Sequence, residues 1–238
     1  MKKAYYFLFL LIAISSFSCK KQMEKVTIEQ TLEDFDTLVL NSVFNVYLTQ
    51  GTENKIKIEG SKKIIEKLNL IVSNSTLKIE NEYKGNWMHP RNNKINLYLT
   101  VKNLSRIIAN ETCHIQSVNT LNTVNMTLIM ASKLNEAELN INCNNFQYWN
   151  NFPCGGKIKL KGNTNSLFFY NVALMAVDAS EFQANYATVY NLSKGDCKIN
   201  CLTLFKYKIL GEGNIYLKGN PVEIIDENPS SVKKVIVE

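Results

Sequence analysis

The sequence has few of the residues from which catalytic and metal sites are built. Its 238 residues include only two histidines, His89 and His114, whereas a zinc site needs three or four ligands. His114 follows Cys113 directly, but neighbours on a strand point to opposite faces, so this pair does not predict a metal centre. No Gly-x-Ser-x-Gly turn is present to hold an activated serine for a Ser-His-Asp set. The sequence therefore predicts no metal, no cofactor and no catalytic residue.

Glycine motifs and clustered charges are also scarce. Gly211-Glu212-Gly213 lacks the third glycine and the following helix of a nucleotide-binding loop, so it predicts a β-turn. Three acids of the second half, Asp178, Glu181 and Asp196, do not recur in phase as paired catalytic carboxylates would. The net charge is +6 with both signs interspersed, and no basic block contains interleaved aromatic residues. Nucleic acid is therefore not an expected partner.

The one long apolar run lies at the N-terminus. Two lysines precede residues 5–14, a run too short to span a bilayer stably but typical of a signal peptide. A small serine and then Cys19 follow, which resembles the lipobox of bacterial lipoproteins, although Ser16 stands where leucine is usual. The sequence predicts a signal peptide over residues 1–18 with Cys19 as the acylated N-terminus. The alternative is an ordinary signal peptide cleaved nearby, with Cys19 incidental.

Residues 19–34 are expected to form a polar tether, and residues 35–238 a single domain. Acyl chains on Cys19 would anchor the protein to a membrane, because each buried methylene contributes about 0.8 kcal/mol. No acidic residue directly follows Cys19, which by analogy favours the outer membrane, with the domain facing the periplasm or the cell surface. No other apolar stretch is long enough to span a bilayer.

The first half of the domain is rich in short apolar alternations. They occur at residues 44–48, 55–59, 77–80 and 95–99. A period of two over four to six residues predicts half-buried strands. The segment Ser61–Leu68 instead has apolar residues at helical spacing after a candidate N-cap serine. We expect a short helix there that closes an open end of the sheet stack.

From residue 104 onward an apolar pair followed by a small or turn-forming residue recurs about every 20 residues. The pairs are Ile107-Ile108, Ile129-Met130, Tyr148-Trp149, Phe169-Tyr170, Val189-Tyr190 and Ile209-Leu210. Further short strands lie between them, and three strands per coil of about 20 residues predict an all-β, right-handed parallel β-helix. An antiparallel β-sandwich is the alternative, because it too has many short strands. It does not require a constant phase.

Five cysteines follow Cys19, at positions 113, 143, 154, 197 and 201. An exported protein can oxidise its cysteines, but an odd number leaves at least one unpaired within the chain. On the expected coil, Cys113 and Cys154 lie two rungs apart, about 10 Å, which exceeds the reach of a disulfide. We therefore expect buried free thiols.

Aromatic residues fall near the same phase of the repeat, and in-phase residues of a solenoid stack about 4.8 Å apart. Outward rings would form a strip able to stack on sugar rings or on a partner surface, whereas inward rings would be core. The candidate ligand-binding residues are Tyr148, Trp149, Tyr170, Tyr190 and Tyr207. Because adjacent residues alternate, only one of Tyr148 and Trp149 should face outward.

Three segments resemble one known family in combination. Residues 35–51 contain an opening strand pair with a Gln-Gly turn, residues 75–79 read Ser-Thr-Leu-Lys-Ile, and residues 209–221 contain a closing Gly-x-Gly-x-Ile-Tyr element. These segments are similar to those of the head GIN domain family of bacterial cell-envelope proteins, whose members are described as "putative auto-transporter adhesin". The resemblance covers about residues 35–225. It implies an exported, repetitive β fold and supplies no catalytic residue.

The chain departs from this family at its corners. The family repeats a Gly-Ser-Gly turn at each coil, whereas here only residues 211–213 keep both glycines. Ala131 and Leu192, at other corners, cannot adopt positive φ comfortably, so we expect a different turn there.

The functional expectation is a non-catalytic, adhesin-like binding or scaffold domain of an envelope lipoprotein. Its expected partner is a glycan or a protein of the envelope. One alternative is a β-helix enzyme that acts on polysaccharide. Another is a purely structural envelope protein.

Overall fold

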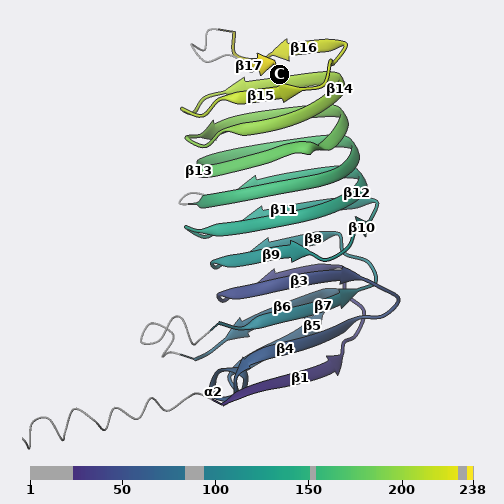
Figure 1. The fold of residues 1–238 in the computed structure, drawn as a ribbon, viewed down its shortest axis with the longest axis vertical. Helices are drawn as coiled ribbons and strands as arrows, with labels where there is room; N and C mark the ends of the chain where they lie inside the picture. The colour runs from purple at the N-terminus through teal and green to yellow at the C-terminus, as the bar shows by residue number, and fades with distance from the viewer. Residues whose placement is uncertain (1–23, 84–93, 151–153, 230–234, 238) are drawn as a thin grey trace, which may run out of the picture.

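The computed structural model describes residues 24–83, 94–150, 154–229 and 235–237. Its strands wind into one elongated β-solenoid, with the N-terminal strands at one end and the C-terminal strands at the other (Figure 1). None of the helices in these ranges is long and apolar enough to cross a bilayer.

The described residues from 106 to 237 form the regular part, which we call the coil region. Its strands are β8 (Arg106–Ala109), β9 (Cys113–Ser117), β10 (Leu121–Asn122), β11 (Asn125–Met130), β12 (Asn135–Asn150), β13 (Gly155–Ser193), β14 (Cys197–Ile209), β15 (Ile215–Lys218), β16 (Glu223–Asp226) and β17 (Val235–Val237). The pairings within it are parallel, and Leu128 lies beside Tyr148, which in turn lies beside Phe169. Partners 20 or 21 residues apart confirm the parallel β-helix, and they contradict the antiparallel sandwich.

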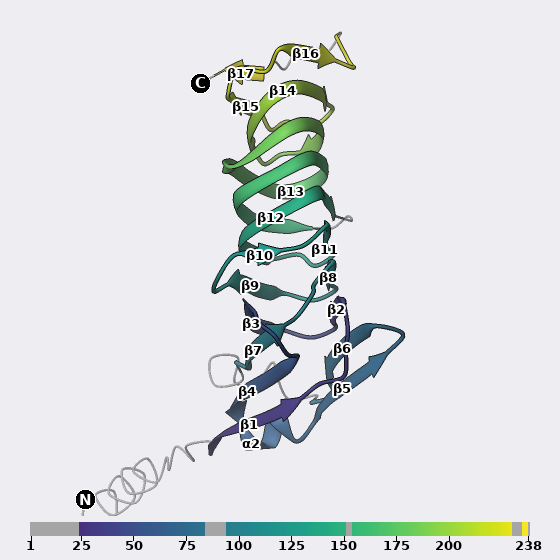
Figure 2. The same cartoon turned by 90° about the vertical axis from the view of Figure 1, so that its right-hand side faces the viewer.

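Residues 24–101 form a less regular N-terminal end, which we call the cap region. Its elements are β1 (Lys25–Thr31), β2 (Thr37–Leu40), β3 (Phe44–Gln50), β4 (Lys55–Ser61), α2 (Lys62–Ile65), β5 (Leu68–Ser73), β6 (Thr76–Asn81) and β7 (Asn96–Val101). Strands β2 and β3 pair in parallel with β8 and β9, and so begin the solenoid. The pairs β1–β4, β4–β7 and β5–β6 are antiparallel, and the β5–β6 hairpin projects sideways in Figure 2.

The expected capping helix is present but short. It spans Lys62–Ile65 and follows β4 directly at the N-terminal end of the stack. Ile64 and Ile65 are buried, and this places the apolar side of the helix against the last core residues. The helix therefore closes this end, as its sequence pattern predicts.

The expected tether is partly wrong, because its second half belongs to the domain. Lys25–Thr31 forms β1, which pairs along its whole length with β4. Asp34 Oδ1 accepts hydrogen bonds from Asn54 Nδ2 at 3.0 Å and from Lys102 Nζ at 2.6 Å. The polar composition of this segment is that of a solvent-facing edge strand. Residues 19–23 and Cys19 lie outside the described residues.

One continuous core fills the solenoid. Side chains alternate along each strand, and the inward positions of successive coils hold Ile107, Leu128, Tyr148 and Phe169, each with no exposed area. Buried asparagines line one corner, where Asn171 Nδ2 donates to Asn191 Oδ1 at 3.2 Å. This bond pairs the Asn171 amide nitrogen with the Asn191 oxygen, whereas the buried Asn171 Oδ1 has no hydrogen-bond partner among the described residues.

The five described cysteines are free thiols, as expected. Four are buried, and Cys143 is half-buried. Burial raises the pKa of both the Cys113 and the Cys197 thiol to about 12.

The corners differ in which residue, if any, has positive φ. Ala131 and Leu192 do not have positive φ, and neither do Gly211 and Gly213, so backbone φ does not separate these corners from the glycine turn. Ala173 takes the left-handed conformation instead, with φ of 64°.

Candidate functional site

Four aromatic side chains cluster on the outer surface of β12 and β13. They are Trp149, Phe168, Tyr170 and Tyr190, and we call them the aromatic strip. The Trp149 ring lies 4.9 Å from the Phe168 ring and 5.7 Å from the Tyr170 ring, while Phe168 lies 5.7 Å from Tyr190. Trp149 is 39% exposed and the other three are half-buried. Ring surface is therefore presented to solvent over successive coils.

The local sequence explains why these rings face outward. Phe169 sits between Phe168 and Tyr170 and points into the core, so strand alternation turns both neighbours out. Trp149 is in register with Tyr170, one coil on. On the other side it is in register with Ile129, which is itself in register with Ile108. The strip thus continues toward the cap region as a column of half-buried aliphatic side chains.

Two of the five expected ligand-binding residues are not on this strip, and the structure corrects their placement. Tyr148 is fully buried and Tyr207 is 8% exposed. Tyr148 is in phase with the inward Leu128 and Phe169, and Tyr207 is in register with the inward Val189. Trp149, Tyr170 and Tyr190 do face outward. Phe168 was missed because it precedes the repeated apolar pair, although its alternation with Phe169 carried the signal.

Two tyrosine hydroxyls near the C-terminal end of the solenoid, one on the strip and one on an inward tyrosine, form hydrogen bonds with acidic side chains. Tyr207 donates to Asp226 Oδ2 at 3.0 Å, and Tyr190 bonds to the side chain of Glu227. The hydrogen bond to Glu227 raises the pKa of Tyr190, and burial followed by the bond to Asp226 raises that of Tyr207. Both therefore remain neutral hydrogen-bond donors at physiological pH.

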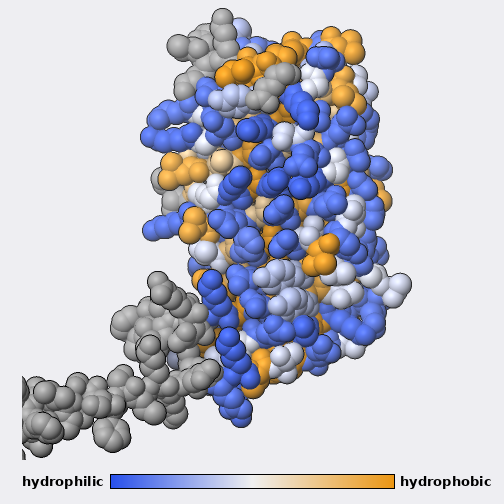
Figure 3. Space-filling model, viewed as in Figure 1, coloured by the Kyte–Doolittle hydropathy of each residue, from blue (hydrophilic) through white to orange (hydrophobic). Residues whose placement is uncertain are grey.

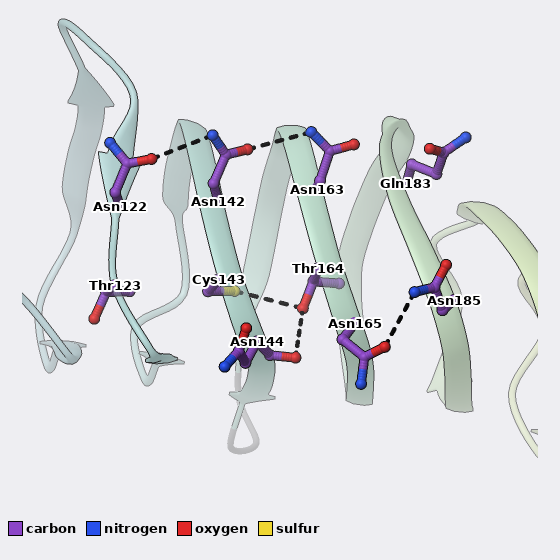
Figure 4. A pocket seen from close by; sticks show the side chains of 10 residues that line it. All are labelled: Asn122, Thr123, Asn142, Cys143, Asn144, Asn163, Thr164, Asn165, Gln183 and Asn185. Carbon is purple, nitrogen blue, oxygen red and sulfur yellow. Dashed lines mark hydrogen bonds between the residues drawn. The ribbon is translucent and has the colours of Figure 1, made fainter.

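A second surface lies at the corner that precedes the strip, and sequence reasoning did not anticipate it. It is a shallow hollow of about 510 Å³, which we call the amide groove (Figure 4). Its lining consists of Asn122, Thr123, Asn142, Cys143, Asn144, Asn163, Thr164, Asn165, Gln183 and Asn185. The lining contains no aspartate, glutamate, lysine or arginine. The abundance of asparagine at the expected corners was the available signal.

The groove amides form ladders along the solenoid axis. Asn142 Nδ2 donates to Asn122 Oδ1 at 3.2 Å, and Asn163 Nδ2 donates to Asn142 Oδ1 at 3.3 Å (Figure 4). Gly162 permits this approach, because it has φ of 106° and a Cβ there would lie 2.2 Å from the Ile141 carbonyl oxygen. The groove surface is therefore held by hydrogen bonds and by close coil contact.

The candidate catalytic and metal-binding side chains are engaged in ordinary contacts. His114 Nδ1 lies 3.1 Å from Glu136 Oε2 on the surface. Asp178 accepts from Ser180, and Asp196 accepts from the Asn214 backbone N–H. Within the described ranges, no group of three or more His, Cys, Asp or Glu could hold a metal ion. His89 lies outside them.

Comparison with known proteins places the chain in a family and a fold. The family profile "Putative auto-transporter adhesin, head GIN domain" matches residues 34–221. A comparison with curated protein sequences found no match.

Solved structures share the fold at low sequence identity. A "putative adhesin" from Bacteroides fragilis is 18% identical, with a TM-score of 0.76 over 90% of this chain and 95% of that one. A "putative adhesin" from Parabacteroides distasonis is 14% identical, with a TM-score of 0.66 over 91% and 97%. A "putative lipid binding protein" from the same species is 17% identical, with a TM-score of 0.59 over 90% and 97%.

The family match spans most of the chain, and the likeness to solved structures extends over the whole solenoid. The family supports an adhesin-like protein associated with the envelope or surface. The chain belongs to the head GIN domain family of adhesin-like proteins.

Proposed function

We propose that this protein is a non-catalytic envelope adhesin that binds a glycan through the aromatic strip. The observation that carries the proposal is the outward clustering of Trp149, Phe168, Tyr170 and Tyr190 on adjacent coils. Aromatic side chains offer large apolar faces with a polar tip, which suits the mixed apolar and hydroxylated surface of a sugar ring.

The geometry of the strip favours an extended ligand. Trp149 and Tyr170 are in register on neighbouring strands, with ring planes 31° apart. Coils repeat about every 4.8 Å, so the rings form a platform along the solenoid axis rather than a closed pocket. A polymer can contact several rings at once, and the sum of weak stacking contacts supplies its affinity.

The glycan proposal is tested with the double variant Trp149→Ala/Tyr170→Ala on a glycan array, followed by titration of the glycans that bind. Loss of each ring removes about 1 kcal/mol of stacking energy, so we expect the Kd of the double variant for the glycan to rise tenfold or more. The matched control is Tyr47→Ala/Tyr98→Ala, which removes two stacked rings 4.9 Å apart in the cap region. This control should bind glycans as the unmodified protein does.

Two outcomes contradict the proposal. One is the absence of any glycan bound by the unmodified protein. The other is equal loss of binding in the strip and control variants when both remain folded. Either outcome supports a purely structural role or a protein partner instead. Turnover of a bound glycan would support the polysaccharide-acting enzyme.

We further propose that acylated Cys19 anchors the protein to the outer membrane. The apolar run before Cys19 and the lipobox-like serine support this assignment. Since β1 begins at Lys25, five residues separate Cys19 from the solenoid, so the distance from the anchor to β1 is at most about 20 Å. The cap region would then face the membrane, and the coil region would carry the aromatic strip away from it (Figure 1).

The anchor is tested by fractionation of cells that produce Cys19→Ala. We expect this variant to leave the membrane fraction, because one thiol carries all the acyl chains. A Lys21→Ala variant, which alters the same segment without removing the thiol, should stay with the membrane. Retention of Cys19→Ala in the membrane fraction refutes the acyl anchor.

A further inference from the structure

We propose that the amide groove binds an uncharged polysaccharide, and that it acts together with the aromatic strip as one extended site. This inference rests on the proposed glycan-binding function and names the ligand class. It is carried by three features of the groove: unused hydrogen-bonding groups, the absence of charge, and continuity with the strip.

Some groove amides have hydrogen-bonding capacity that the protein does not use. Among the described residues, no partner contacts the side-chain amides of Asn144 and Gln183, whereas Asn142 both donates and accepts within its ladder. The Asn185 amide donates to Asn165 Oδ1 at 3.0 Å. An amide carries donor and acceptor side by side, so it can engage a hydroxyl group through either role. A ligand with many hydroxyl groups satisfies such a surface.

The electrostatics of the groove select against charged ligands. The charges next to the groove balance, because Lys159 and Lys161 lie 3.4 Å and 3.6 Å from Glu181 and Lys161 also lies 4.0 Å from Glu138, two cations with two anions. Cys143 remains a neutral thiol, since burial raises its pKa. An acidic polysaccharide would have to give up water at its carboxylates without gaining a cationic partner. A neutral chain has no such cost.

The groove and the strip lie on the same strands. Asn165 precedes Phe168 by three residues on β13, a separation of about 10 Å along the strand. One oligosaccharide can therefore form hydrogen bonds in the groove while an adjacent sugar stacks on the strip. The ladders hold most groove amides in place before binding, and this lowers the entropy cost of forming those hydrogen bonds.

The test uses affinity electrophoresis and titration with soluble polysaccharides of both kinds. Dextran, laminarin and hydroxyethylcellulose serve as neutral probes, and alginate and polygalacturonate as acidic ones. We expect binding to at least one neutral probe and to neither acidic probe. Because no charge is involved, Kd should stay constant from about 0.05 M to about 0.5 M salt.

The groove is tested with Asn144→Ala/Gln183→Ala, which removes the two unused amides and leaves the ladders intact. We expect Kd for the neutral probe to rise about tenfold, since two hydrogen bonds to ligand are lost. The matched control is Asn103→Ala/Asn220→Ala, which removes two exposed amides outside the groove. The control should retain the unmodified affinity.

The outcomes separate this inference from the proposed function. If acidic probes bind and only the strip variant weakens them, the glycan-binding function stands and the neutral groove is refuted. If a neutral probe binds and the groove variant has the same affinity as its control, the role of the amide groove in binding is refuted and the glycan-binding function again stands. If no probe of either kind binds, both proposals fail.

Discussion

The cap region and the coil region obey different pairing rules, although one core runs through both. In the coil region a strand pairs in parallel with residues 17 to 22 positions away, so each side chain stacks on its counterpart in the next coil. In the cap region β1, β4 and β7 pair antiparallel, and β5 and β6 form a local hairpin. Only the parallel arrangement repeats one side-chain position along an axis. The aromatic strip and the amide groove accordingly lie in the coil region.

The two ends of the solenoid also differ in how their edges are covered. At the N-terminal end, β1 and α2 cover the last core residues. At the C-terminal end, β16 and β17 retain exposed apolar side chains, such as Ile224 at 47% and Val237 at 60%. On the face seen in Figure 3, hydrophilic side chains dominate, and hydrophobic ones gather near this C-terminal end. An antiparallel layer therefore closes an end that a further parallel coil would leave open.

The largest expected effect is on the coil core. Phe169→Ala should lower the free energy of unfolding by about 3–5 kcal/mol, because the lost ring contacts both Phe146 and Tyr148 in the preceding coil. Urea unfolding followed by circular dichroism measures the change. The control is Phe168→Ala at the half-buried, outward-facing neighbour, which should cost much less. Equal costs would mean that the inward column does not hold the coils together.

A cap variant should have a smaller and more local effect. Ile64→Ala should destabilise the N-terminal end by about 2 kcal/mol, because contacts in a solenoid extend mainly to neighbouring coils. Hydrogen exchange should become faster in β1 and β4 and stay unchanged in β13. Uniformly faster exchange over the whole chain would show that the cap and coil regions unfold as a single unit.

The buried asparagine ladder should contribute less than the aromatic core. Asn171 Nδ2 donates to the Met175 carbonyl oxygen at 2.9 Å and contacts Asn191 and Cys197. Asn171→Ala removes these buried hydrogen bonds, although Ser193 still donates to the Met175 carbonyl oxygen and to Asn191 Oδ1. We therefore expect a loss of about 1–3 kcal/mol in unfolding free energy. The surface ladder variant Asn45→Ala serves as the cap-region control, because its bond to Asn96 is only part-buried. A smaller loss for Asn171→Ala than for Asn45→Ala would contradict the ladder's role.

The buried thiols predict a modest dependence of stability on pH. Folding raises the pKa of Cys113 and Cys197 from 9.0 to about 12, so the folded protein keeps protons that the unfolded chain releases. Their contribution is complete below pH 9 and is lost as the pH rises toward 12. At pH 10 each thiol should lower the free energy of unfolding by about 1 kcal/mol. Urea titrations of Cys197→Ala should show a shallower fall, and an unchanged slope would contradict this.

The coil region was largely predictable from sequence, because a repeated apolar pair reports a structural period directly. The cap region was predictable only in part. The alternation of apolar and polar residues predicted its strands, and the spacing of Ile64 and Ile65 predicted its helix. Antiparallel pairing between strands that are distant in the sequence has no local sequence signal. Lys25–Thr31 was assigned to a tether because an exposed edge strand has the same polar composition as a linker.

The functional surfaces were predictable to a similar degree. The phase of the 20-residue repeat correctly placed Trp149, Tyr170 and Tyr190 on the outer surface. It also placed Tyr207 there, although Tyr207 points into the core. Tyr207 pairs with Val189 rather than with Tyr190, and a shift of one residue moves a side chain to the opposite face. Coil length therefore decides orientation, and the length of this coil depends on bulges in β13 and β14 that the sequence does not mark.

The most direct test of the account is the fluorescence of Trp149 during glycan titration. In a Trp87→Phe variant, Trp149 is the remaining tryptophan and reports on the aromatic strip alone. The account predicts a saturable change in its emission as a bound neutral polysaccharide is added, with the change much reduced in Tyr170→Ala. Tight binding of that polysaccharide with no change in Trp149 emission would contradict the claim that the stacked coils present the strip as the binding surface.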